Sequence, residues 1–439
     1  MSLLVVTLSI YAIFCAFIFY VCFYADSETS SLANLFLIKL PRWIFTGVER
    51  FFGPTVCQFL RSLSEMFLMI TYLFIVLGSW SIMFCFGYPM ITESTYVSDV
   101  HKYVGYVVFA ACMTSWRYAS RKSPGYITSM TIPKFDNYEY DNLMFVPNRI
   151  CRTVGIRKLA RSKYDIYANR HVARFDHFCG WLNNPIGEEN YRYFLLFLFI
   201  HVGMCAYGSY VTANLFIGEI HEKRLWNAVF FNAATGEEVL VDWIILAHFL
   251  FAQHMCVGAV LVLMTCMTIA LGLFLSFHLY LLFQNMTTNE YYKWKAIRKW
   301  YKQESTKYDE YLQKGGTPLK PGTSIPIDSA TDNATNSSQS PVDMNDDNQV
   351  GCTGPSTVTT STTTKTVNVD EDDIMNPGPK PENIYNLGIL QNTYEVLYPR
   401  CLRPNAINRW REAYIKHRKQ QQQQQVDSPL PERPNKKNK

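Results

Sequence analysis

Apolar residues in this chain gather into a few long runs, and strongly polar stretches separate the runs. Three runs, at residues 3–24, 66–86 and 193–216, contain no Lys, Arg, Asp or Glu. At about 1.5 Å of rise per helical residue, each run is long enough to cross the ~30 Å hydrocarbon core of a membrane. We interpret the first run as an uncleaved signal anchor, because its start lacks the basic residues of a cleaved signal peptide.

Two further apolar runs are less regular. Residues 103–116 are short for a crossing, whereas residues 239–283 are too long for one. The longer run contains Asp242 and His254, so we predict an interfacial first part followed by a span from Met255 to Phe283. With the short run counted, the chain has about five spans of the length that a bilayer requires.

Lysine and arginine residues predict the orientation, because short loops rich in them stay cytosolic. They are most frequent in residues 117–192, less frequent in 25–65, and rare in 88–102 and 217–242. This alternation predicts a lumenal N-terminus and a cytosolic C-terminus, and it requires the short run to cross. The sequence therefore predicts an α-helical polytopic membrane protein with a small irregular cytosolic domain before the fourth span.

Beyond the last span the composition changes. Residues 285–314 combine Trp and Tyr with Lys and Arg, as in a helix at the headgroup boundary. Residues 315–380 have too little apolar surface to form a core, so we predict no structure there. An apolar island at 381–400 is expected to pack on the core, and the basic tail 401–439 contains a glutamine run, 420–425, that we interpret as inert linker. The N-terminal part of the chain divides into three predicted regions. They are residues 1–118 with spans one to three and the cytosolic loop 25–65, residues 119–192 with the cytosolic domain, and residues 193–284 with spans four and five.

The overall charge and the cysteine pattern exclude two classes of function. A total of 41 Lys and Arg against 36 Asp and Glu leaves a net charge of +5, which is too weak a bias to indicate a nucleic-acid partner. The chain has 12 cysteines, but no two of them are spaced as Cys-x-x-Cys, and this spacing excludes a zinc ribbon.

Candidate chemistry lies in residues 150–192, a compact cytosolic segment that contains Asp176, His177 and Cys179. A cysteine attacks as its thiolate, a neighbouring imidazole accepts the thiol proton, and a carboxylate orients that imidazole. If residues 175–179 are extended, His177 and Cys179 project to the same side, which a helix does not allow. All three parts of such a site are present in Asp176, His177 and Cys179, but from the motif alone a chance occurrence in a basic loop is favoured.

Further residues accompany this motif in a fixed order. They are Arg-Lys-x-Ala-Arg-Ser-Lys at 157–163, Arg174-Phe175-Asp176-His177-x-Cys179, Trp181, Asn183-Asn184, Ile186-Gly187, Asn190 and Tyr193-Phe194. The segment resembles the cysteine-rich domain of the DHHC protein S-acyltransferases, as a divergent member with Asp-His-Phe-Cys. Two motifs farther along resemble the same family, namely Thr287-Thr288-x-Glu290 after the last span and the segment around Asn392. Their order and their place relative to the spans resemble the endoplasmic reticulum type of the family.

The resemblance implies two structural zinc sites, but most ligand positions carry other residues. The first site keeps Cys151, has His171 in place of a cysteine, and has Val154 and Tyr164 at its other positions. The positions of the second site hold Asp165, Ala168, Phe178 and Pro185. Structural zinc requires four nitrogen or sulfur donors in a tetrahedron. We therefore predict that zinc is lost or strongly reduced, that no residue is a metal ligand, and that Val154, Tyr164, Tyr167 and Phe178 pack in its place.

The resemblance implies an enzyme that takes a fatty acyl group from palmitoyl-CoA, or a similar acyl-CoA, onto Cys179 and passes it to a cytosolic cysteine of a membrane-associated protein. It implies Cys179 as the catalytic nucleophile, His177 as general base and Asp176 as the orienting partner of that base. Acyl-CoA is then a substrate, and no cofactor is implied. Arg149, Arg152 and Lys158 are candidates to meet the CoA phosphates, with a solvated basic face as the alternative. The alternative for the whole protein is a catalytically silent relative that acts as a membrane scaffold, because loss of zinc would leave His177 and Cys179 poorly positioned.

The end of the chain carries a possible location signal. Lys436-Lys437-Asn438-Lys439 fits a dilysine retrieval signal in the predicted cytosolic tail, with a generic basic tail as the alternative. We therefore predict the endoplasmic reticulum, with the Golgi as the second choice, and a lipid bilayer but no nucleic acid among the partners.

Overall fold

The computed structural model of the protein describes residues 40–231, 236–322, 324–326 and 373–426. Helices dominate, and the chain divides after Gly78 into two compact units. The first predicted span, residues 3–24, and the predicted dilysine signal lie outside the described residues.

Helix α3 (Leu40–Ile82) makes up the described part of the first unit and ends in the second. Its backbone departs from helical geometry at Gly53, with a φ of 81°, which glycine adopts without steric cost. The helix continues through the π-helix η2 (Met83–Gly87) and α4 (Tyr88–Glu93), so that Met66–Glu93 is one apolar stretch long enough to cross a membrane. The predicted cytosolic loop 25–65 is therefore helical from Leu40 onward. Its prolines Pro41 and Pro54 are compatible with helix because each lies in a first turn, at the start of α3 or directly after the Gly53 kink.

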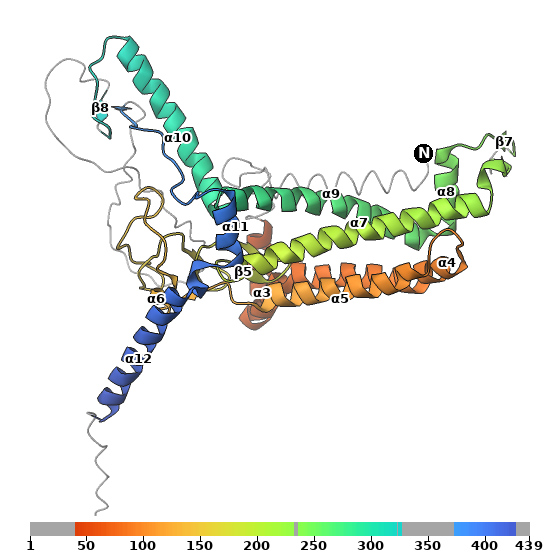
Figure 1. The fold of residues 1–439 in the computed structure, drawn as a ribbon, viewed down its shortest axis with the longest axis horizontal. Coiled ribbons are helices and arrows are strands. Elements are labelled where there is room, and N and C mark those ends of the chain that lie inside the picture. The colour runs from red at the N-terminus through yellow and green to blue at the C-terminus, as the bar shows by residue number, and fades with distance from the viewer. Residues whose placement is uncertain (1–39, 232–235, 323, 327–372, 427–439) are drawn as a thin grey trace, which may run out of the picture. The chain divides into compact units, whose positions relative to one another are not determined.

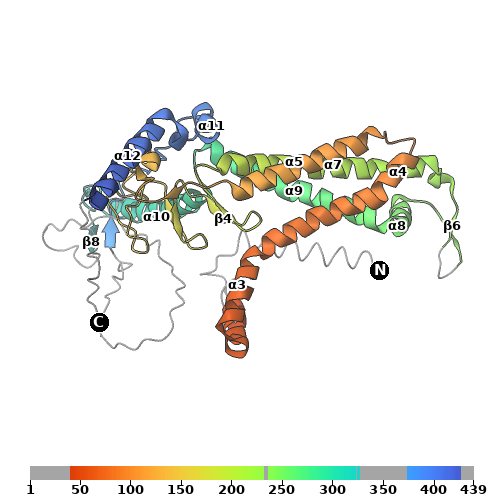
Figure 2. The same cartoon turned by 90° about the horizontal axis from the view of Figure 1, so that it is seen from below.

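Three helices of the second unit run side by side, α5 (Val100–Arg121), α7 (Tyr191–Glu222) and α9 (Met255–Phe283), with α7 packed on both others (Figures 1 and 2). Among the described residues, α7, α9 and Met66–Glu93 are the helices long and apolar enough to cross a membrane. The predicted short third span is α5, which is helical over 22 residues but carries Lys102 and Arg121 near its ends. The prediction of a helical polytopic membrane protein is confirmed. In the described part of the chain, three helices are long and apolar enough to cross a membrane.

The long run 239–283 divides as predicted. A short connection with η3 (Leu225–Asn227) and the pair β6 (Phe230–Phe231) and β7 (Glu238–Val239) leads from α7 to α8 (Trp243–Gln253). Asp242 caps α8, since its Oδ1 accepts a hydrogen bond from the Ile245 amide at 2.8 Å. His254 breaks the helical geometry, and α9 begins at Met255.

The segment between α5 and α7, residues 122–190, forms a small irregular domain that we call the loop domain. Its first sheet has the order β1 (Tyr126–Ile127), β3 (Arg170–Val172), β2 (Lys163–Asp165), and the short helix α6 (Ile132–Phe135) lies between β1 and β2 in sequence. A separate hairpin pairs β4 (His177–Cys179) with β5 (Asn184–Ile186). The apolar core of the domain includes Ile127, Phe135 and Leu159, and Cys401 from the C-terminal part completes it.

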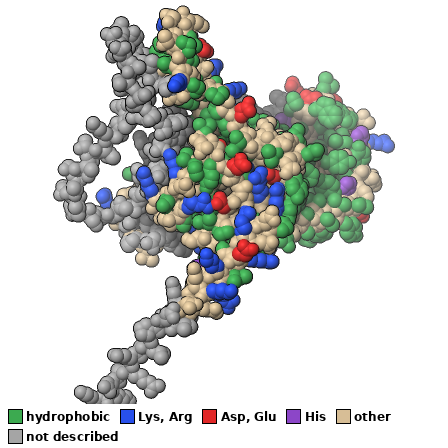
Figure 3. All heavy atoms as spheres, turned by 60° about the vertical axis from the view of Figure 1, so that its left-hand side comes forward, with side chains coloured by type: hydrophobic (Ala, Val, Ile, Leu, Met, Phe, Trp, Pro, Cys, Tyr) green, Lys and Arg blue, Asp and Glu red, His purple; other side chains and the backbone are tan. Residues whose placement is uncertain are grey.

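The C-terminal part begins with α10 (Thr288–Gln313). Strands β8 (Ser324–Pro326) and β9 (Asp373–Met375) then pair inside the region predicted to lack structure. Helix α11 (Ile389–Leu397), η5 (Arg400–Leu402) and α12 (Pro404–Val426) follow, and α11 packs against α9 and α7. Residues 420–425 continue α12 in place of the predicted linker, because glutamine favours helix. Charged side chains gather over the loop domain and α12, whereas the receding helices are mostly apolar (Figure 3).

Candidate active site

The β4–β5 hairpin places the three predicted catalytic residues together. Cys179 pairs with Asn184 and His177 with Ile186, so the extended segment expected from the sequence is present and its alternate residues share a side. Asp176 lies directly before β4, and its amide donates to the Ile186 carbonyl at 2.8 Å.

The Asp176 carboxylate is held from two directions. It is 2% exposed, and its Oδ2 lies 2.6 Å from Nδ1 of His177. At the start of α10, the Thr288 amide donates to Oδ1 at 2.7 Å and the Thr288 hydroxyl donates to Oδ2 at 2.9 Å. Burial alone would raise the pKa of Asp176, but the hydrogen bond and positive charge of His177 lower the pKa to about 2. The carboxylate is therefore ionised at neutral pH.

His177 links this carboxylate to Cys179. Burial opposes a charge on the imidazole, yet its hydrogen bonds with Asp176 and Cys179 raise its pKa to about 10. His177 is thus an imidazolium at neutral pH, and it lies beside a cysteine that is 7% exposed. An imidazolium next to a thiol stabilises the thiolate, which is the nucleophilic form.

The hairpin is anchored to the neighbouring helices by asparagines of the motif. Asn184 Nδ2 donates to the Ala119 and Lys122 carbonyls at the end of α5, at 3.1 and 2.9 Å. Asn190, just before α7, donates to the Pro185 carbonyl and accepts from the Gly187 amide. A Cβ atom at Gly187 would lie 2.6 Å from the Pro124 oxygen, so only glycine fits there.

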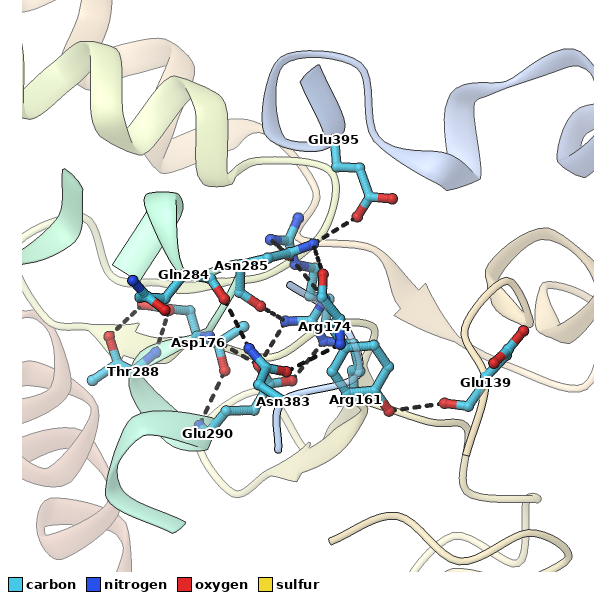
Figure 4. A network of polar contacts seen from close by, with 12 residues as sticks. Glu139, Arg161, Arg174, Asp176, Gln284, Asn285, Thr288, Glu290, Asn383 and Glu395 are labelled. Carbon is cyan, nitrogen blue, oxygen red and sulfur yellow. Dashed lines mark hydrogen bonds and ion pairs between the residues drawn. The ribbon is translucent and has the colours of Figure 1, made fainter. Parts of the chain in front are cut away.

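A second set of polar contacts ties the loop domain to α10 (Figure 4). Arg161 is fully buried, and its Nε and Nη2 donate to the two oxygens of Glu290 at 2.7 and 2.6 Å. Glu290 and Thr287 also form a capping box, in which each side chain bonds the other residue's backbone amide. The Thr-Thr-x-Glu motif therefore makes two sets of contacts. Thr288 donates hydrogen bonds to Asp176, and Thr287 and Glu290 cap the N-terminus of α10.

Asn285 joins this network to the C-terminal part. It has a φ of 48° directly after α9, a conformation that asparagine tolerates. Its Oδ1 accepts from Arg174 at 2.8 Å and from Arg161 at 3.1 Å, and its Nδ2 donates to Glu395 of α11 at 2.9 Å. The predicted Asn392 has no exposed surface and donates to the Phe283 carbonyl at 2.8 Å, which fastens α11 to the end of α9.

Comparisons with known proteins agree with this geometry. Residues 144–295 match the family model described as DHHC palmitoyltransferase. The matched part of the chain is thus similar to a DHHC domain. It includes the hairpin with Cys179, helices α7 and α9, and the start of α10.

Several curated relatives match a wider region. Palmitoyltransferase ZDHHC4 of Mus musculus is 32% identical over 198 residues, which are 44% of this chain and 57% of the relative. The Bos taurus protein of the same name is 36% identical over 172 residues, 39% of this chain and 50% of the relative. Palmitoyltransferase SWF1 of Yarrowia lipolytica is 28% identical over 239 residues, 50% of this chain and 58% of the relative. The chain thus spans little more than half the length of these relatives.

The positions where the DHHC domain would hold zinc carry side chains that do not fit a tetrahedral zinc site. Phe178 faces Pro185 across the hairpin and stacks on Tyr167, with ring centroids 4.5 Å apart. Asp165 uses its carboxylate to accept the Ala168 amide at 2.7 Å, which closes a turn. These contacts lie at the positions where the resemblance implied the second zinc site.

The positions of the first implied zinc site also carry side chains that are mostly not zinc ligands. Tyr164 faces His171 across β2 and β3, with ring centroids 5.9 Å apart, and Cys151 is buried. Val154 is 37% exposed, which is against the prediction that it packs in place of a ligand. Tyr167 is 64% exposed and contacts Phe178 through the ring stack.

His278 lies beside the predicted catalytic residues but was not predicted from the sequence. Among the described residues, Asp176, His177 and His278 form the group of His, Cys, Asp or Glu side chains whose donor atoms lie within 4.8 Å of one another. Asp176 and His177 already share a hydrogen bond at 2.6 Å, so the arrangement suits proton sharing better than metal binding. A histidine inside the otherwise apolar α9 was the available signal.

Proposed function

We propose that the protein is a protein-cysteine S-acyltransferase that carries a fatty acyl group on Cys179. The observation that supports this proposal best is the chain of contacts from Thr288 to Asp176, His177 and Cys179. This chain provides a nucleophile, a charge partner for its thiolate and a fixed orientation for that partner. The DHHC domain and the palmitoyltransferase names of the relatives point the same way.

The reaction has two steps. In the first, the Cys179 thiolate attacks the thioester carbon of acyl-CoA, the new S–acyl bond forms, and CoA leaves as its thiolate. In the second, the thiol of a cysteine in a membrane-associated protein gives its proton to water and attacks the acyl-enzyme, the new S–acyl bond forms, and Cys179 leaves as a thiolate beside the His177 imidazolium. Palmitoyl-CoA is the proposed donor.

The location of the hairpin supports a lipid substrate. The hairpin is bonded to the end of α5 and lies just before the apolar helix α7, so we infer that an acyl chain on Cys179 extends along that helix. Each buried CH₂ contributes about 0.8 kcal/mol. Arg149 and Arg152 are exposed on the loop domain and are proposed to meet the CoA phosphates.

The scaffold alternative rested on the expectation that loss of zinc displaces the catalytic residues. In the structure Asp176 and His177 share a hydrogen bond on the hairpin that carries Cys179, and Phe178 of the same strand stacks on Tyr167. We therefore infer an active enzyme whose loop domain holds much less zinc than two ions per chain. We also propose that the loop domain is cytosolic and that the protein resides in the endoplasmic reticulum. Replacing both Lys436 and Lys437 by serine should let the protein leave that compartment.

A labelling experiment tests the function. The purified full chain is incubated with a clickable palmitoyl-CoA, and we expect a label that hydroxylamine removes, as for a thioester. Cys179→Ala should abolish the label, whereas Cys151→Ala, a second buried cysteine of the loop domain, should keep it. Equal labelling of wild type and Cys179→Ala would overturn the proposal.

A further inference from the structure

Helix α10 begins directly after a membrane-spanning helix. Residues 284–287 join it to the end of α9 at Phe283. Trp294 and Ile297 of α10 pack with Leu281 of α9 in one apolar cluster. The helix turns away from the line of α9 instead of continuing it (Figure 1). Because α9 has the length of a membrane span and ends at Phe283, the first turns of α10 lie at the depth of the lipid headgroups.

One row of side chains along α10 is aromatic at its start and basic beyond it. We call it the basic row, and it consists of Tyr291, Lys295, Arg298 and Lys302. Residues with this spacing of four, three and four positions share one face of a helix. The Tyr291 ring lies 5.3 Å from the Phe277 ring of α9 between centroids, so this face points toward the membrane-spanning helix. The three basic side chains that follow Tyr291 on the same face are exposed.

Charge is distributed unevenly along α10. Residues 291–303 contain five Lys or Arg and no Asp or Glu, whereas Glu304, Asp309 and Glu310 lie farther from α9. Among the described residues, the exposed ion pair of α10 is Lys307–Glu304, and no carboxylate pairs with Lys295 or Lys302. The part of the helix next to the membrane therefore carries positive charge that the described part of the protein does not neutralise.

We propose that the basic row is a docking surface for anionic lipid headgroups in the leaflet beside the loop domain. Its position at headgroup depth, its orientation toward α9 and its charge all fit this occupant. A basic residue close to an anionic membrane surface strengthens binding about 5-fold, and three such residues on one face act together. The phosphate and carboxylate groups of a lipid such as phosphatidylserine accept hydrogen bonds from Lys and Arg.

The phosphates of CoA have the same chemistry as a lipid headgroup, but the shape of this surface suits them less well. A single phosphate ligand is held by donors that converge in a concave site. The basic row lies on a convex helix face, and its cations spread over about 10 Å from Lys295 to Lys302 at the rise of an α-helix. Such a row fits headgroups that lie beside one another in a membrane surface.

Lipid binding to the full chain in neutral detergent tests the proposal. The probe is a short-chain fluorescent phosphatidylserine, followed by fluorescence anisotropy, with the matching phosphatidylcholine as neutral lipid. Replacing both Lys295 and Lys302 by glutamine should weaken phosphatidylserine binding about 30-fold and leave phosphatidylcholine binding unchanged. Wild-type binding of phosphatidylserine should also weaken when salt is raised from about 0.1 M to about 0.5 M. Replacing the same two lysines by arginine keeps the charge and should keep the binding.

The matched control replaces Lys307 and Lys314 by glutamine. Both are exposed lysines beyond the basic row, so the change in net charge is the same, and we expect binding within about 2-fold of wild type. Equal losses in the two double variants, or none in the Lys295 and Lys302 variant, would overturn the inference. If that variant keeps phosphatidylserine binding but raises the KM for palmitoyl-CoA, the row holds CoA phosphates and the inference is wrong. Because the readout is lipid binding, failure of Cys179 to become acylated would overturn the transferase and leave this inference standing.

Discussion

At the scale of single residues, the site depends on where one proton lies. Asp176 receives three hydrogen bonds, from His177 and twice from Thr288, and this concentration of donors keeps it ionised. The ionised carboxylate in turn keeps His177 protonated beside Cys179. The sequence motif names these residues, but the charge on His177 follows only from the contacts.

The pH dependence of acylation tests this proton arrangement. The pKa of Asp176 is lowered to about 2 and that of His177 is raised to about 10, so neither group changes charge between them and the wild-type rate should be flat near neutral pH. Asp176→Asn removes the carboxylate that raises the pKa of His177. The imidazolium should then be lost as pH rises through its ordinary pKa of about 6.5, and acylation with it. With a pKa of about 6.5, about a quarter of the imidazole is charged at pH 7, so the acylation burst should slow about 4-fold at pH 7 and about 30-fold at pH 8. Asp165→Asn is the control, and a variant profile as flat as that of wild type would contradict the assignment.

Thr288 offers a second test at this scale. Thr288→Val removes the hydroxyl that donates to Asp176 but keeps the backbone amide and the shape of the side chain. A hydrogen bond to a charged group contributes about 1.5–3 kcal/mol, so acylation should slow by about 10- to 100-fold. Thr288→Ser, which keeps the hydroxyl, should recover most of the rate. If the two variants behave alike, the hydroxyl has no part in orienting Asp176.

At the scale of elements, the buried pair Arg161–Glu290 fixes the loop domain to α10. Arg161→Met leaves the Glu290 carboxylate buried without its partner, and the expected loss in free energy of unfolding is about 3–5 kcal/mol. Combining it with Glu290→Leu should cost less than the sum of the two single changes. Arg157→Met, which breaks the partly exposed pair with Asp136, should cost about 1 kcal/mol or less. Thermal unfolding in detergent measures all four, and simple additivity at 161 and 290 would exclude a direct coupling.

The Tyr167–Phe178 stack includes Phe178, one position of the implied second zinc site, and we propose that this stack packs in place of the metal. Because Phe178 is only half-buried, Phe178→Ala should cost about half of the ~3–5 kcal/mol of a fully buried ring. Tyr167→Ala in the same background should then cost little more, since the stack is already broken. Phe178→His should not raise the zinc content, because the other positions still lack donors. Metal analysis that finds added zinc in this variant would contradict the packing account.

At the scale of the whole molecule, sequence reasoning identified what depends on local pattern. Continuous apolar runs revealed the membrane helices, and the alternation of His177 and Cys179 anticipated the strand that holds them. Contacts between segments far apart in the sequence could not be predicted, because they depend on how the helices pack. Arg161 meets Glu290, Asn285 meets Glu395, and His278 approaches His177 only because α9, α10 and α11 converge on the loop domain.

The most direct test of the account is the mass of the intact protein during a single turnover, with its zinc content measured on the same sample. We expect one palmitoyl group per chain, located by peptide mapping on Cys179, lost on addition of a cysteine peptide, in protein with far less than two zinc ions. An acyl group on another residue, or none at all in folded protein, would contradict the central claim that this DHHC domain carries out acyl transfer through Cys179.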